Sequence, residues 1–267
     1  NIIEFTKEEE ERGRRGLLFM GLKPESKFIT LIVRDAAYLK NQTKESSSGV
    51  DWSHNNYRDT NIQNYMLAAD ELVKHGYYVI RMGAVVNEPM NSNNNMVIDY
   101  ATNGMRTEFM DVYLGAKCDF CISTATGYDA IPSIFRRPKL TVNLAHVEYF
   151  HSFFLNDLTL FMKIKNKNSG EFLSLKSIID SGFGRLSRAD SFVKSDIELI
   201  ENTPAEIRDA TVEMILRVSG KWNDDWYDRD VQPIIESIFS KSNINGQIQS
   251  RFTTSFLKDN MYLLKTF

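Results

Sequence analysis

The feature that most constrains the fold of this chain is a regular alternation of short apolar runs and amphipathic stretches between residues 28 and 143. The apolar runs predict buried strands at 28–33, 77–82, 96–100, 120–123 and 140–143. The stretches between them predict helices at 61–75, 106–116 and 129–135. Strands and helices that alternate with short connections form a parallel sheet with right-handed crossovers and helices on both faces. The expected fold class is therefore α/β.

The flanking segments are expected to be mostly helical. A charged helix begins at residue 7 and ends before Gly21 and Pro24, and residues 40–56 are polar and predict a loop. Helices are also predicted at 173–181, 231–240 and 250–264. The clearest one covers 204–218, with Thr203 as its N-cap. We expect a Rossmann-like domain over residues 1–220 and a helical C-terminal extension over 221–267.

Composition and motifs exclude several classes. A net charge of −3 argues against binding nucleic acid through bulk charge. The sequence lacks the glycine-rich dinucleotide motif, the Walker phosphate loop and the nucleophile elbow of hydrolases. Cys118 and Cys121 have a C-x-x-C spacing, which fits a metal or redox pair, but the surrounding pattern favours small apolar residues of a buried strand. We therefore expect no metal.

No apolar run is long enough to span a membrane, and no signal peptide is recognised. The expected location is the cytoplasm. Peripheral association with the inner face of the membrane is compatible with this expectation. The chain begins with Asn1, which indicates a processed chain or a fragment.

Parallel sheets bind ligands at the carboxyl ends of their strands, so the residues that follow each strand are the candidate site. Arg34 and Asp35 follow the first strand. The last residue of the 120–123 strand, Ser123, begins a loop that continues through Thr124, Ala125, Thr126 and Gly127. The helix after this loop presents free N–H groups, where an anion gains about 0.3–1 kcal/mol. Together the loop and Arg34 predict a diphosphate site. The alternative is that Thr126 only caps the helix and Arg34 only pairs with an acid.

Three further residues are candidates for ligand contacts. Arg81 lies at the end of the second strand, where it faces either an acid or a ligand. Asp99 and Tyr100 lie where a ribose or a base could be held.

Several motifs occur in an order that resembles a family of bacterial glycosyltransferases from surface-polysaccharide gene clusters. The resemblance covers roughly residues 28–145. Its motifs are Val33-Arg34-Asp35, Tyr57-Arg58-Asp59, Gly76 to Gly83, Ile98 to Ala101, Phe109 to Leu114, Ser123 to Gly127 and Val142-Asn143. More remotely, the layout is similar to the carboxyl-terminal domain of GT-B enzymes of the heptosyltransferase and fucosyltransferase types.

The resemblance implies a metal-independent transfer of a sugar from a nucleotide-sugar donor to a glycan, lipid-linked or protein acceptor, with no separate cofactor. In fucosyltransferase-like members an Arg after the first strand binds the donor diphosphate, and Arg34 matches that position. The catalytic base in this architecture often comes from an N-terminal acceptor domain. That domain is expected to be missing from this chain or supplied by an oligomer partner, and Asp35 and Glu148 are the local candidates.

Two other functions stay open at this stage. One is a sugar-nucleotide epimerase or hydrolase on the same fold, and the other is a non-catalytic module that binds nucleotide sugars.

Overall fold

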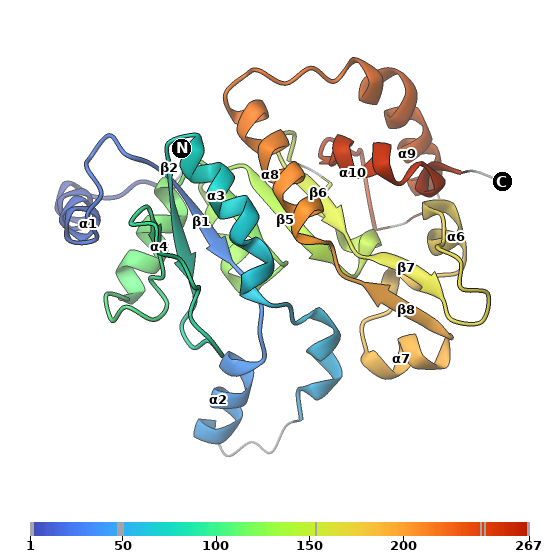
Figure 1. Ribbon diagram of the computed structural model, residues 1–267, viewed down its shortest axis with the longest axis horizontal. Coiled ribbons are helices and arrows are strands. Elements are labelled where there is room, and N and C mark those ends of the chain that lie inside the picture. Colours follow the sequence, from blue (N-terminus) through green and yellow to red (C-terminus); the bar gives the residue numbers. More distant parts are fainter. Residues whose placement is uncertain (1–2, 47–50, 153, 241, 243, 266–267) are drawn as a thin grey trace.

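The computed structural model describes residues 3–46, 51–152, 154–240, 242 and 244–265. Its centre is a seven-stranded sheet in which all neighbouring strands are parallel, in the order β3-β2-β1-β4-β5-β6-β9 (Figure 1). The strands are β1 (Lys27–Ile32), β2 (Tyr77–Met82), β3 (Val97–Ile98), β4 (Cys121–Ser123), β5 (Lys139–Leu144), β6 (Leu158–Phe161) and β9 (Arg251–Phe252). The predicted parallel α/β sheet is confirmed. The chain order reverses between β1 and β4, and a sheet of this kind opens a crevice at that point.

Helices cover both faces of the sheet, as predicted. Helices α3 (Met66–Lys74) and α8 (Pro204–Val218) lie side by side over one face (Figure 1). Helix α4 (Glu108–Lys117) covers the other face, and α1 (Lys7–Phe19) packs against it. Side chains of β1 alternate between the two layers, because successive residues of a strand point to opposite faces. Ile29 and Leu31 join the cluster under α3 and α8, whereas Phe28 joins the cluster under α4.

Helix α8 begins and ends where the sequence predicts. The Thr203 side chain accepts a hydrogen bond from Glu206 N, and the Glu206 side chain accepts one from Thr203 N. Such a capping box satisfies two N–H groups of the first turn and stabilises the helix by about 1 kcal/mol.

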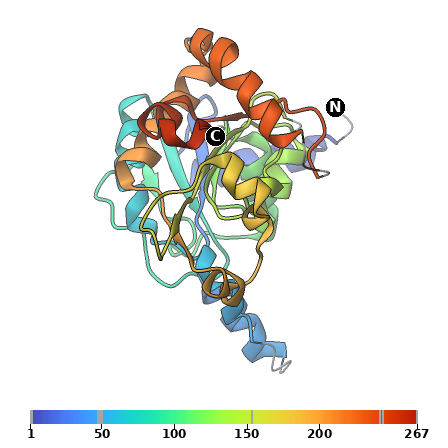
Figure 2. The same cartoon turned by 90° about the vertical axis from the view of Figure 1, so that its right-hand side faces the viewer.

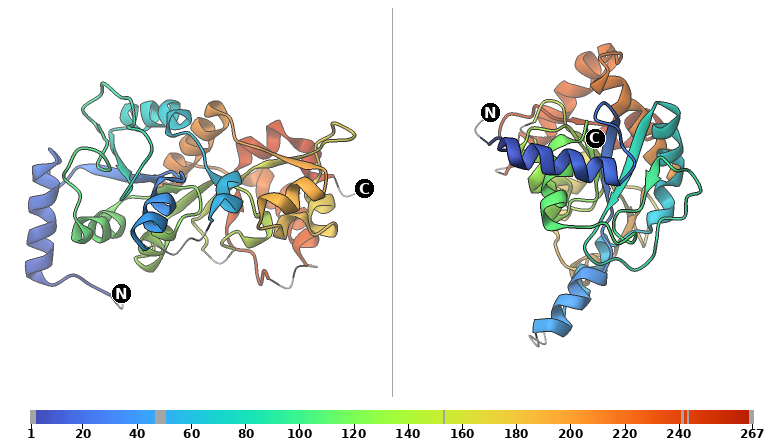
Figure 3. Two further views of the ribbon diagram at one scale, coloured as in Figure 1. Left: turned by 90° about the horizontal axis from the view of Figure 1, so that it is seen from below. Right: turned by 90° about the vertical axis from the view of Figure 1, so that its left-hand side faces the viewer.

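The segment after β1 differs from its prediction. Residues 40–46 belong to helix α2 (Ala37–Ser46) rather than to a loop, and η1 (Ser53–Arg58) is a 3-10 helix. Residues 47–50 of the predicted loop lie outside the described part of the chain. Asp35 explains the start of α2, because its Oδ1 accepts a hydrogen bond from Ala37 N at 2.8 Å. Helix α2 projects away from the body of the molecule (Figures 2 and 3).

The last third of the chain adds a second, smaller sheet and one more strand of the main sheet. Strands β7 (Lys163–Asn166) and β8 (Ile197–Ile200) form a separate antiparallel pair. Residues 250–264 were predicted as one helix, but the segment opens with β9, which pairs with β6 in the main sheet. The remaining helical elements are η2 (Ile62–Tyr65), η3 (Gly127–Asp129), α5 (Ala130–Ile134), η4 (Val147–Tyr149), α6 (Leu175–Asp180), η5 (Phe183–Arg185), α7 (Ala189–Lys194), η6 (Tyr227–Val231), α9 (Gln232–Phe239), α10 (Thr254–Asp259) and η7 (Met261–Leu264). In the described ranges, no helix has the length and apolarity to cross a bilayer.

Candidate functional site

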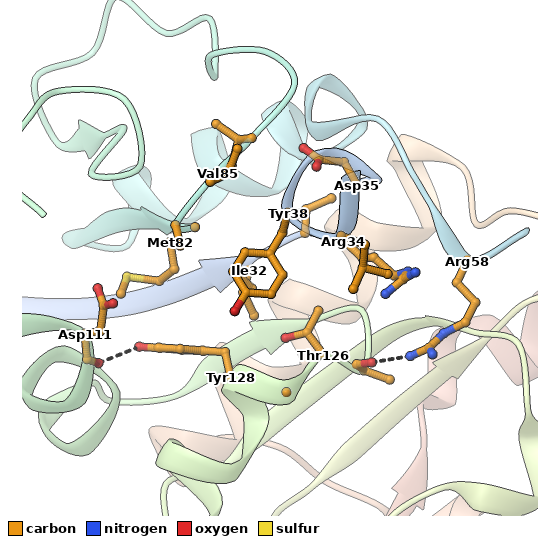
Figure 4. A pocket seen from close by; sticks show the side chains of 17 residues that line it. Ile32, Arg34, Asp35, Tyr38, Arg58, Met82, Val85, Asp111, Thr126 and Tyr128 are labelled. Atoms are coloured by element: carbon orange, nitrogen blue, oxygen red, sulfur yellow. Dashed lines mark hydrogen bonds between the residues drawn. The ribbon is translucent and has the colours of Figure 1, made fainter. Parts of the chain in front are cut away.

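A cavity of about 450 Å³ lies at the crevice where the strand order reverses (Figure 4). Its walls come from the segments that follow β1, β2 and β4, together with η1 and α4. The lining residues are Ile32, Val33, Arg34, Asp35, Tyr38, Leu39, Arg58, Met82, Gly83, Ala84, Val85, Val86, Asp111, Ala125, Thr126, Gly127 and Tyr128. The position agrees with the general rule for open parallel sheets, which bind ligands beyond the carboxyl ends of the strands at the switch point.

Two arginines converge at one side of this cavity. The side chains of Arg34 and Arg58 point toward each other in Figure 4. Arg34 Nε lies 3.2 Å from Asp59 Oδ1, and both side chains are mostly buried. Arg58 forms no ion pair with a described carboxylate, and its Nη2 donates a hydrogen bond to Ala125 O at 2.5 Å. Burial and the charge of Arg34 lower the pKa of Arg58. An arginine still keeps its charge at neutral pH, so one side of the cavity holds two positive charges beside two carboxylates, Asp59, which pairs with Arg34, and Asp35.

The loop after β4 forms the floor beside these arginines. Ala125 has a φ of 57°, a left-handed conformation that costs an alanine about 1 kcal/mol or more. The hydrogen bond from Arg58 to the Ala125 carbonyl fixes this conformation. Gly127 lines the cavity too, and a Cβ built on it would meet no atom within 4 Å. The fold therefore leaves open space at Gly127.

Of the three hydroxyl residues in the predicted loop, Ser123 and Thr124 do not line this cavity. The Ser123 hydroxyl is buried and donates to Asp129 Oδ1. Thr124 Oγ1 is also buried and accepts a hydrogen bond from Arg34 N at 2.8 Å. Thr126 lines the cavity, and its hydroxyl is 3.3 Å from Asp129 Oδ1. Ser123 and Thr124 thus hold the loop and the backbone of Arg34 in place.

The structure separates the two acids that were candidates for a catalytic base. Asp35 lines the cavity, but its Oδ1 accepts from Ala37 N and its Oδ2 accepts from Asn87 N. Glu148 is fully buried outside the cavity, where Oε2 accepts from Arg185 Nε at 2.7 Å and from Ser242 Oγ at 3.1 Å. Of the two, only Asp35 is near the proposed ligand.

Arg81 and Asp99 form an ion pair outside the cavity, and Tyr100 makes separate hydrogen bonds there. Arg81 is 1% exposed, and its Nη1 donates to Asp99 Oδ1 at 3.0 Å while Nη2 donates to the Glu88 carbonyl. Asp99 Oδ2 accepts from Met90 N as well. The Tyr100 hydroxyl accepts a hydrogen bond from Thr107 N and donates one to the Thr107 carbonyl. The structure does not bring these three residues to the cavity, so they are not part of the site proposed below.

Sequence reasoning missed two polar residues at the opposite side of the cavity, Asp111 and Tyr128 (Figure 4). Asp111 Oδ2 pairs with Arg106 Nη2 at 2.6 Å, whereas the buried Oδ1 has no hydrogen-bond partner among the described residues. Burial raises the pKa of Asp111. The Tyr128 hydroxyl donates to the Asp111 carbonyl at 3.3 Å. The helical spacing of 106–116 indicated only that Phe109, Met110, Tyr113 and Leu114 pack inward, and it gave no signal for Asp111.

A histidine–tyrosine pair lies next to Arg58. The Tyr57 hydroxyl and His146 Nε2 form a hydrogen bond, and the two rings meet edge to face. Burial, together with the positive charge of Arg58, lowers the pKa of His146 to about 4. His146 is therefore neutral at physiological pH, although it follows β5 at the same edge of the sheet.

This pKa predicts how stability depends on pH. In the unfolded chain His146 binds a proton near its ordinary pKa, but the folded chain does not bind it until the pH falls to about 4. The free energy of unfolding should therefore decrease as pH falls from 6.5 toward 4, with His146 contributing about 2 kcal/mol. In His146→Gln, which keeps an acceptor for Tyr57, that part of the loss should vanish. Urea unfolding at pH 7 and at pH 4.5 measures it, with the exposed His75→Gln as control. An equal pH dependence in wild type and His146→Gln would contradict the assignment.

The C-x-x-C pair is part of the core. Cys118 and Cys121 are buried and not joined by a disulfide, and burial raises the pKa of Cys118 to about 12. Such thiols are poor nucleophiles and poor metal ligands. Within the described part of the chain, no group of three or more His, Cys, Asp or Glu side chains is placed to hold a metal ion.

The fold and the cavity define an α/β protein with a cavity lined in part by charged side chains at the switch point of a Rossmann-like sheet. No family model, no curated protein and no solved structure matches the chain.

Proposed function

We propose that this chain is a glycosyltransferase that binds a nucleotide sugar in the switch-point cavity and transfers the sugar to a glycan, lipid-linked or protein acceptor. The observation that carries the proposal is the convergence of Arg34 and Arg58 on the Ala125–Gly127 loop. Both guanidinium groups can bind a ligand with more than one negative charge, because the Asp59 carboxylate is paired with Arg34 and the Asp35 oxygens accept backbone hydrogen bonds. A diphosphate meets that requirement.

The rest of the cavity suits a nucleoside. Between the arginines and Asp111 the walls are apolar, formed in part by Ile32, Met82 and Val85 (Figure 4). Apolar walls with a few polar groups are typical of small-molecule sites. In the proposed pose the base lies against these side chains, Asp111 Oδ1 accepts a hydrogen bond from the base or the ribose, and the diphosphate lies between the arginines.

The transfer follows from this pose. As the bond between the sugar and the diphosphate breaks, negative charge grows on the leaving phosphate oxygen. Arg34 and Arg58 stabilise that charge more strongly in the transition state than in the bound donor, which lowers the barrier. In this proposal the positive charge comes from the two side chains, so the transfer is metal-independent. The resemblance to polysaccharide glycosyltransferases supplies the reaction type, and the geometry supports the diphosphate.

Calorimetric titration with UDP, GDP, CDP, ADP and dTDP tests the first step. We expect one of them to bind with a Kd in the micromolar range and the corresponding nucleoside to bind much more weakly. If none of the five binds, the proposed function is wrong. With the nucleotide known, incubation with its sugar conjugates separates the reaction types. Release of free sugar or of an epimer without an acceptor would favour a hydrolase or an epimerase, and binding without any turnover would favour a non-catalytic module.

Gly127 provides a test that leaves the fold intact. Its backbone is not left-handed and its Cβ position is empty, so Gly127→Ala should unfold at the same urea concentration as wild type or slightly higher. The added methyl group enters the space proposed for the phosphates, so nucleoside diphosphate affinity should fall at least fivefold. Gly246→Ala, at another open glycine, should change neither property. Unchanged affinity in Gly127→Ala would place the phosphates elsewhere.

A further inference from the structure

Tyr38 presents an aromatic ring to the switch-point cavity. It belongs to the first turn of helix α2, a few residues after the end of β1. The residue is 45% exposed, although it lines a cavity with several apolar side chains. Its ring lies in the middle of the close view, between the two arginines and Asp111 (Figure 4). The ring therefore borders the space that the proposed ligand occupies.

The second aromatic residue among the described lining residues, Tyr128, is part of the wall itself. Its hydroxyl donates to the Asp111 carbonyl, and its ring packs against the cluster under α4. The Tyr38 hydroxyl accepts a hydrogen bond from Gln42 Nε2 at 2.8 Å, one turn further along the same helix. That bond engages the hydroxyl at the edge of the ring, so it does not occupy the faces of the ring.

The carboxylate of Asp35 fixes the place of Tyr38 relative to the segment after β2. Asp35 Oδ1 accepts a hydrogen bond from Ala37 N, the residue before Tyr38, at 2.8 Å. Asp35 Oδ2 accepts one from Asn87 N at 2.9 Å, two residues after Val85. The segments that carry Tyr38 and Val85 are therefore joined through one side chain, and both residues line the cavity.

An aromatic ring with apolar neighbours is suited to bind a planar base. Ile32, Met82 and Val85 line the same part of the cavity as Tyr38 (Figure 4). Every nucleobase has a π face, so stacking on an aromatic side chain adds affinity with any base. A nucleotide joins its base to the phosphates through a single ribose. A ligand whose diphosphate lies at the arginines can therefore bring its base to Tyr38 within one cavity.

We infer that Tyr38 stacks on the base of the nucleotide and supplies a large part of the affinity for the nucleoside. This inference rests on the proposed function, because the arginines must hold the diphosphate for the base to reach Tyr38. The two ends of the ligand are then bound by different means. The arginines bind the diphosphate through charge, and Tyr38 binds the nucleoside through the face of its ring.

The test is a calorimetric titration of wild type and variants with three ligands. They are the tightest binder among UDP, GDP, CDP, ADP and dTDP, the nucleoside of that binder, and inorganic pyrophosphate. In Tyr38→Ala the Kd of the nucleoside diphosphate and that of the nucleoside should each rise at least fivefold, and the Kd of pyrophosphate should stay unchanged. Tyr38→Phe should bind all three as the wild type does, because it keeps the ring and loses only the hydroxyl. Phe19→Ala, at an exposed aromatic residue that ends α1, is the matched control.

Tyr38→Trp gives a second readout that reports the stack directly. A base stacked on an indole quenches the fluorescence of that indole. The three tryptophans of the wild type, Trp52, Trp222 and Trp226, do not line the cavity. Adding the nucleoside diphosphate should therefore quench the tryptophan emission of Tyr38→Trp clearly more than that of the wild type, and pyrophosphate should quench neither.

Three results would overturn the inference and leave the proposed function standing. The first is a nucleoside diphosphate affinity that is unchanged in Tyr38→Ala. The second is an equal loss of pyrophosphate affinity in that variant, because Tyr38 would then act on the phosphates or on the shape of the cavity. The third is an emission of Tyr38→Trp that stays constant while the diphosphate binds. If no nucleoside diphosphate binds the wild type, the proposed function and the inference are both wrong.

Discussion

Replacing Arg58 by glutamine should weaken the binding of the nucleoside diphosphate by about 10- to 100-fold and leave the binding of the bare nucleoside unchanged. A hydrogen bond between a guanidinium and a phosphate is worth about 1.5–3 kcal/mol, and 1.4 kcal/mol corresponds to a factor of ten in affinity. Arg58 is the better choice for the test because Arg34 already pairs with Asp59, so that removing Arg34 would leave a mostly buried carboxylate alone. The measurement is a calorimetric titration of both ligands against both proteins.

Glutamine is too short to replace the hydrogen bond from Arg58 Nη2 to the Ala125 carbonyl, so the loss combines the missing charge with a changed loop, and only the charge part depends on salt. Affinity of the wild type should also fall as salt is added, and this salt dependence should be smaller in Arg58→Gln. Arg15→Gln is the matched control, because Arg15 is an exposed arginine on α1. If Arg58→Gln binds the diphosphate as the wild type does, the two arginines are not the phosphate site.

The sheet was predictable because its cause is local. Each strand is an apolar run that can be recognised without knowing its neighbours, and alternation with helices then requires parallel pairing. Strand β6 was missed, although Leu158–Phe161 is fully buried, because only four residues form it and no helix pattern precedes it. Strand β9 is shorter still and was absorbed into a predicted helix.

The site was predictable only where a residue's position depends on the strand end itself. Arg34 and the Ala125–Gly127 loop directly follow β1 and β4, and both line the cavity. Arg81 was expected at the end of its strand too, but it lies inside β2, and the Glu88 carbonyl and Asp99 enclose its guanidinium. The partners of Arg81 come from a segment whose path over the strand has no signature in the sequence.

Arg58 lines the cavity although it was not among the predicted site residues. It belongs to η1, between β1 and α3, in a polar stretch with no strand to place it. Its partner is the carbonyl of Ala125, 67 residues away along the chain. A contact to a backbone carbonyl leaves no trace in residue type, so only the folded chain could bring Arg58 to the site.

Removing the side chain of Glu213 should lower the free energy of unfolding by about 1–3 kcal/mol, the second large effect that we expect. Glu213 is 1% exposed on α8, and its Oε1 accepts from Arg217 Nη2 at 2.8 Å. Its Oε2 accepts from Thr254 N at 2.7 Å, at the start of α10. In Glu213→Ala the N–H of Thr254 is left buried without its acceptor. Arg217 loses one of its two carboxylate partners and keeps the other, Asp224.

The Glu213 carboxylate joins the two units that the sequence predicts, residues 1–220 and 221–267. Glu213 belongs to α8, which ends at Val218, and its partner Thr254 begins α10, which follows β9. If residues 221–267 are an integral part of the sheet, Glu213→Ala should lower the midpoint of a single urea transition. If they are a separable extension, the transition should split, and the diphosphate affinity should survive the first step. Glu213→Gln, which keeps an acceptor for Thr254 but loses the charge facing Arg217, should fall between wild type and alanine. Glu236→Ala, at an exposed glutamate of α9, should cost less than about 0.5 kcal/mol. A loss below about 1 kcal/mol in Glu213→Ala would show that the C-terminal segment does not depend on this contact.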